Sequence, residues 1–152
     1  MLSQGQRENE CALAAVCNYY EKDYESVRAA VVSRFGDWGG KDIKPWYEGS
    51  PFMNASHLLI CDLTGVPMAT LKNAFRAAYT RFMDSTGSVF ISRGRPPKLY
   101  IPEGSGFLVI VRLSGKRLAH LVAFSNGSVS DSDSKDLVTG LKGTLLNERM
   151  FR

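Results

Sequence analysis

The chain has 152 residues and a net charge of +4, with 44% hydrophobic and 22% charged residues. These values are typical of one globular domain with a single hydrophobic core, so we expect one domain over residues 1–152. The small positive excess argues against a nucleic-acid-binding protein, and no apolar run is long enough to cross a bilayer. We therefore expect neither a nucleic-acid partner nor a membrane segment.

The three cysteines are odd in number and show no spacing typical of a disulfide framework. Free thiols are typical of a reducing compartment, so we expect a cytoplasmic protein. His57 and Cys61 could share a helix face, but no further ligands follow at the spacing of a zinc site. We therefore expect no metal ion and no cofactor.

Apolar residues in the first half of the chain recur every three or four positions, which is typical of amphipathic helices. Gly36 ends the second of these patterns, and Gly65 with Pro67 ends the third. The expected helices span residues 10–20, 24–35, 54 or 56 to 63, and 70–83. Residues 36–53, which are rich in glycine, are expected to form the longest irregular stretch.

The second half is expected to be an antiparallel sheet, because β-branched and aromatic runs alternate there with Gly, Pro and Ser. Asn126-Gly127 predicts a hairpin turn that pairs Ser125 with Ser128. The expected strands span residues 88–93, 98–101, 106–113, 119–125 and 128–131, and Leu145 begins a last strand or helix. Helices followed by strands indicate the α+β class.

Cys11 stands where a polar, acidic lead-in changes to an apolar helix. The first N–H groups of a helix have no partner within it, and they carry a partial positive charge. Both effects stabilise a thiolate over a thiol, so we expect Cys11 to be a reactive cysteine. Cys17 falls within the apolar stripe of the same helix and is expected to belong to the core.

His120 lies in the strand that leads into the Asn126-Gly127 turn. The register set by a two-residue turn places His120 across from Asp133 and one diagonal step from Asp131. Either carboxylate could orient the imidazole, and a bulge or an early end of the strand would decide between them.

The candidate residues fall in two motifs. The motifs are Gln6-Arg7-Glu8-Asn9-Glu10-Cys11-Ala12-Leu13-Ala14 and His120-Leu121-Val122-Ala123-Phe124-Ser125-Asn126-Gly127-Ser128-Val129-Ser130-Asp131-Ser132. These motifs resemble those of papain-like cysteine peptidases, above all the small bacteriocin-processing peptidases and related phage-encoded domains. The resemblance implies a papain-like α+β fold in which N-terminal helices pack on a C-terminal antiparallel sheet.

The resemblance also implies a role for each residue that matches the motifs. Cys11 corresponds to the nucleophile, His120 to the general base and Asp131 to the acid that orients it. Gln6 corresponds to the glutamine whose amide stabilises the oxyanion, with Gln4 as a second candidate. The spacing of the hairpin keeps Asp133 as the alternative acid.

These roles imply a thiol-dependent hydrolase that cleaves a peptide or isopeptide bond through an acyl-enzyme, with a protein or peptide as its substrate. A papain-fold acyltransferase would use the same residues. The non-enzymatic alternative is a catalytically inert domain of this fold that binds a partner.

Overall fold

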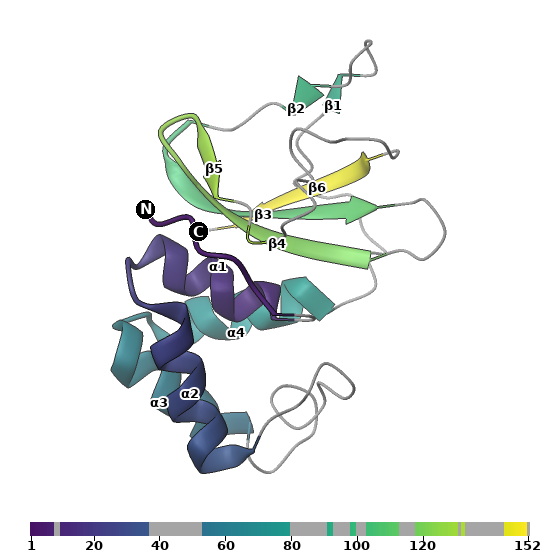
Figure 1. Cartoon of the computed structure of the whole chain (residues 1–152). Coiled ribbons are helices and arrows are strands. Elements are labelled where there is room, and N and C mark those ends of the chain that lie inside the picture. Colours follow the sequence, from purple (N-terminus) through teal and green to yellow (C-terminus); the bar gives the residue numbers. More distant parts are fainter. Residues whose placement is uncertain are drawn as a thin grey trace.

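The computed structural model describes residues 1–7, 10–36, 53–79, 91–92, 98–99, 103–112, 118–130, 132 and 145–151. For residues 53–54, 77–79, 91–92, 98–99, 109–112, 118–120 and 145–151 it describes the backbone alone. The helices come first in the chain and the strands second, which confirms the α+β class (Figure 1). The helices are α1 (Cys11–Tyr19), α2 (Tyr24–Phe35), α3 (Met53–Thr64) and α4 (Met68–Tyr79). The strands are β1 (Ile91–Ser92), β2 (Lys98–Leu99), β3 (Ser105–Arg112), β4 (Leu118–Ser125), β5 (Ser128–Ser130) and β6 (Leu145–Phe151).

The ends of α2 follow from two local signals that the sequence contains. The carboxylate of Asp23 accepts a hydrogen bond of 2.9 Å from the Ser26 N–H, which satisfies one of the unpaired donors of the first turn. Gly36 ends the helix at a φ of 88°, a conformation that favours glycine. The predicted range of α2 is therefore confirmed.

The fourth helix begins two residues earlier than predicted, at Met68 instead of Thr70. The carbonyl of Pro67 accepts a hydrogen bond of 3.0 Å from the Leu71 N–H, so this proline opens α4 as well as separating it from α3. The predicted extension of this helix to Met83 lies outside the described residues.

The four larger strands form one antiparallel sheet in the order β5-β4-β3-β6, and β1 pairs with β2 alone. The predicted hairpin is confirmed: Asn126 and Gly127 have φ values of 50° and 81°, and Ser125 pairs with Ser128. β6 pairs with β3, so Leu145 begins a strand. Strands β1 and β2 lie within the first two predicted strands, and the other residues of those two predicted ranges lie outside the described residues.

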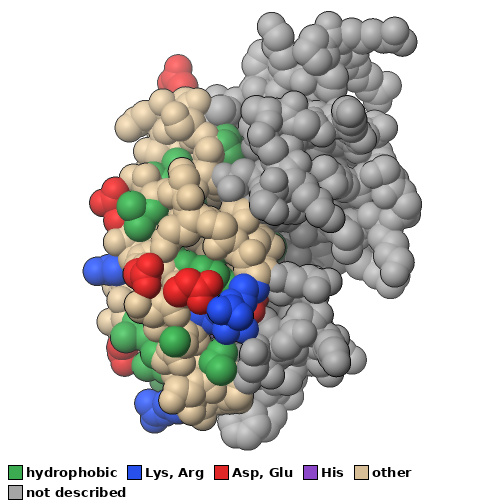
Figure 2. Space-filling model, viewed as in Figure 1, with side chains coloured by type: hydrophobic (Ala, Val, Ile, Leu, Met, Phe, Trp, Pro, Cys, Tyr) green, Lys and Arg blue, Asp and Glu red, His purple; other side chains and the backbone are tan. Residues whose placement is uncertain are grey.

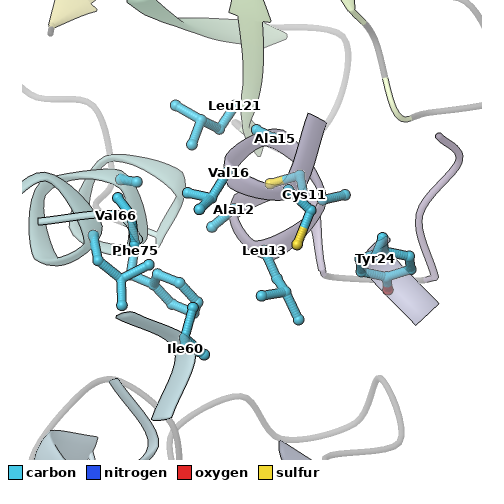
Figure 3. Close-up of a cluster of buried hydrophobic side chains, with 14 of the residues drawn as sticks. Cys11, Ala12, Leu13, Ala15, Val16, Tyr24, Ile60, Val66, Phe75 and Leu121 are labelled. Atoms are coloured by element: carbon cyan, nitrogen blue, oxygen red, sulfur yellow. The ribbon is translucent and has the colours of Figure 1, made fainter. Parts of the chain in front are cut away.

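Helix α1 is the centre of the core. Its residues from Cys11 to Cys17 are all buried, which is expected of a stretch that is apolar on every side, and Asn18 is buried with its amide bonded to Gln4. It packs against β4, α2 and α4, and the cluster in Figure 3 joins it to Phe75 of α4 and Leu121 of β4. The predicted burial of Cys17 is confirmed. Among the described helices, none combines the length and the apolar character that a bilayer crossing needs.

Candidate active site

Cys11 is the first residue of α1, as predicted, and 5% of its surface is exposed. It belongs to the buried cluster shown in Figure 3. No side-chain cap satisfies the first N–H groups of α1. This is the local arrangement that the sequence predicted for a reactive thiol.

His120 lies in β4, where its backbone pairs with Ile110 of β3. The structure describes its backbone but not its side chain. β4 contacts the core cluster through Leu121 and Ala123, whereas Val122 is buried without belonging to that cluster. Because side chains alternate along a strand, Val122 is assigned to the sheet face that is turned away from α1.

Helix α1 and strand β4 run in the same direction. The Tyr19 hydroxyl at the end of α1 lies 3.0 Å from the Ser105 hydroxyl, and Ser105 pairs with Ser125 at the end of β4. Cys11 lies about 12 Å back from Tyr19 along the helix axis, by the rise per helical residue. His120 lies about 16 Å back from Ser125 along the strand, by the rise per strand residue. The two residues therefore share one end of the packed helix–strand pair, and both elements begin on the same side of Figure 1.

Gln6 contacts the segment that follows β5. Its backbone N–H donates a hydrogen bond of 2.8 Å to the Ser132 carbonyl, and its side-chain Oε1 accepts one of 2.5 Å from the Ser132 hydroxyl. Nearby, the Ser130 hydroxyl donates a hydrogen bond of 2.6 Å to the Leu2 carbonyl. The N-terminal segment (residues 1–7) is thus fixed against the residues that flank Asp131. Asp131 and Asp133 themselves lie outside the described residues.

Gln4, the second candidate for the oxyanion amide, has a different role. Its Oε1 accepts a hydrogen bond of 2.9 Å from the Tyr24 N–H, and its Nε2 donates to the Lys22 carbonyl at 2.7 Å and to Asn18 Oδ1 at 3.2 Å. These contacts use both ends of the carboxamide to hold the connection between α1 and α2. Gln6 is therefore the better candidate.

A buried ion pair that was not predicted from the sequence lies beside Cys11. The Arg28 Nε donates to the Glu10 carboxylate at 2.8 and 3.0 Å, and the Tyr24 hydroxyl donates to the same carboxylate. Glu10 is 1% exposed. Burial first, and then the hydrogen bond to Glu10, raises the pKa of Tyr24, so its phenol remains a donor. One signal was present, since Tyr24 and Arg28 are four residues apart on one helix face.

The other two cysteines have environments that disfavour a thiolate. Burial raises the pKa of the Cys17 thiol to about 12. Burial, and to a smaller extent the charge of Asp62, also raises the pKa of Cys61 in α3. In the part of the chain that the structure describes, no group of three or more His, Cys, Asp or Glu side chains could hold a metal ion.

Comparison with known proteins gave no match to a protein-family model. The chain likewise has no significant match among curated proteins or among solved structures.

Proposed function

We propose that this protein is a papain-like, thiol-dependent hydrolase that cleaves a peptide or isopeptide bond. The observation that carries the proposal is the pair of hydrogen bonds between Gln6 and Ser132, residues separated by 126 positions in the sequence. These bonds join the lead-in of Cys11 to the residue that follows Asp131. The parallel course of α1 and β4 supports the same arrangement, because the backbones of Cys11 and His120 then lie at one end of this helix–strand pair.

In the proposed reaction, His120 takes the proton of Cys11 and the sulfur attacks the carbonyl carbon of the scissile bond. The carbonyl oxygen becomes an oxyanion, which the Gln6 amide and the Cys11 backbone N–H stabilise. The C–N bond breaks as His120 returns the proton to the leaving amine. Water then attacks the thioester, with His120 again as the base, and releases the acid. Asp131, or alternatively Asp133, holds the imidazole in the orientation that this needs.

The proposed substrate is a protein or peptide. Acidic and basic side chains are interspersed over the described part of the face in Figure 2, which is not the pattern of a nucleic-acid-binding surface. All three cysteines are free, so we further propose that the protein works in a reducing compartment such as the cytoplasm. If an amine instead of water accepted the acyl group, the same residues would catalyse acyl transfer.

A second candidate function is a catalytically inert domain that binds a partner. The observation that favours it is the burial of Cys11, because a nucleophile with 5% of its surface exposed is difficult for a substrate to reach. Under this alternative the thiol is only a small apolar part of the core.

Alkylation with iodoacetamide near neutral pH tests the proposal against this alternative. Exposure alone predicts that the half-buried Cys61 reacts before Cys11. An activated nucleophile predicts the reverse order, with Cys11 alkylated at least about tenfold faster than Cys61 and Cys17. Mass spectrometry of the digested protein measures the three rates, and the urea-denatured chain provides the control in which all three thiols are accessible. Faster alkylation of Cys61, or equal rates for all three, would exclude an activated Cys11.

A further inference from the structure

Ser132 forms two hydrogen bonds with Gln6. A substitution of Ser132 can remove only one of them. The bond between the Gln6 N–H and the Ser132 carbonyl involves backbone atoms, so it persists when the side chain is changed. The bond from the Ser132 hydroxyl to Gln6 Oε1, 2.5 Å long, depends on the side chain alone. Ser132 is 1% exposed, so its hydroxyl is sheltered from competing water.

The contact to Oε1 also determines where the other end of the carboxamide points. A glutamine side chain carries an acceptor oxygen and an NH2 group with two donors, separated by the planar amide. When a buried hydroxyl donates to the oxygen, the NH2 group is directed away from that hydroxyl. An oxyanion requires a donor that is already oriented before the charge develops.

We propose that Ser132 is a positioning residue for Gln6. The Ser132 hydroxyl holds the carboxamide oxygen of Gln6, so that the NH2 group of Gln6 is presented to the oxyanion. This inference rests on the proposed function, since it assigns to Ser132 a role in the same reaction. Ser132 acts only through Gln6 and does not itself contact the reacting atoms.

Two reagents distinguish this role from a structural one, because only one of them forms an oxyanion when it reacts with Cys11. With p-nitrophenyl acetate, the Cys11 sulfur attacks the ester carbonyl, an oxyanion forms, and p-nitrophenolate leaves as the thioester is formed. With iodoacetamide, the sulfur displaces iodide from a methylene carbon and no oxyanion forms. Loss of oxyanion stabilisation should therefore slow acetylation of Cys11 but not its alkylation.

Ser132→Ala should lower the acetylation rate of Cys11 about fivefold to tenfold relative to its alkylation rate, the effect of one hydrogen bond. Gln6→Ala should lower the same ratio about a hundredfold, the effect of one oxyanion donor. The double variant should match Gln6→Ala alone, because Ser132 has no effect once Gln6 is absent.

Ser130→Ala is the matched control. Ser130 is also 1% exposed and its hydroxyl also bonds the N-terminal segment, at the Leu2 carbonyl, but it does not bond Gln6. This variant should leave the ratio of the two rates unchanged. Ser132→Thr, which keeps a hydroxyl donor, should recover most of the ratio that Ser132→Ala loses.

Three results would overturn the inference. They are an unchanged ratio in Ser132→Ala, an equal loss in Ser130→Ala and Ser132→Ala, and a further loss when Ser132→Ala is added to Gln6→Ala. Failure of the proposed function gives a different result. In the unmodified protein, Cys11 would then react no faster than Cys61 with either reagent.

Discussion

Replacement of Cys11 by alanine should abolish turnover of p-nitrophenyl acetate, lowering the rate at least about a thousandfold, because no other group in the proposed site can form the thioester. The fold should persist. α1 already carries alanine at positions 12, 14 and 15, and alanine has the highest helix propensity. Release of p-nitrophenolate measures the rate, and circular dichroism measures the helix content.

Cys17→Ala is the control for this variant, because it removes a second buried sulfur from the same helix. It should cost stability through the cavity that it leaves and should retain full turnover. Undiminished turnover in Cys11→Ala, or an equal loss in both variants, would contradict the role of Cys11 as the nucleophile.

Glu10→Gln should lower the free energy of unfolding by about 3–5 kcal/mol. The reason is that it removes the negative charge to which the buried Arg28 guanidinium donates. Arg28→Met should be similarly costly, because it removes the positive charge beside the buried Glu10 carboxylate. Urea denaturation followed by circular dichroism measures both effects.

The double variant Glu10→Met with Arg28→Met should lower the free energy of unfolding by less than the loss of either charge alone, since both buried charges are then absent. The ion pair between Arg7 and Glu25 provides the matched control. Its atoms are 3.1 Å apart and its side chains are 55% and 59% exposed, so Glu25→Gln should leave the denaturation midpoint almost unchanged. A Glu10→Gln variant as stable as Glu25→Gln would contradict our account of the buried pair.

Much of the local structure was predictable from the sequence because its causes are local. Gly36 ends α2, and Asn126 with Gly127 makes the hairpin turn, since each requires a backbone conformation that few other residues adopt. The burial of α1 from Cys11 to Cys17 follows from the apolar character of these residues. These features depend on residues within a few positions of one another.

The contacts that assemble the candidate site were not predictable in the same way. The bonds from Gln6 to Ser132 and from Leu2 to Ser130 join residues more than 120 positions apart, and no periodicity in the sequence indicates them. The ion pair between Glu10 and Arg28 was missed because charged residues are expected at the surface. The strand that contains His120 was predicted, but the face of the sheet that packs on α1 depends on tertiary packing.

The proposed mechanism requires that the Cys11 sulfur and the His120 imidazole meet. Leu121 and Ala123 pack with α1, and regular alternation would assign position 120 to the face of Val122. The pairing of β4 with β3 is unbroken from Leu118 to Ser125, so the mechanism requires the two groups to meet around the edge of the strand.

A crystal structure of the protein with Cys11 reduced is the most direct test. We predict a distance of about 3–4 Å between the Cys11 Sγ and a ring nitrogen of His120, with Asp131 or Asp133 bonded to the other nitrogen. A sulfur and an imidazole that the sheet separates, with no contact around its edge, would contradict the mechanism.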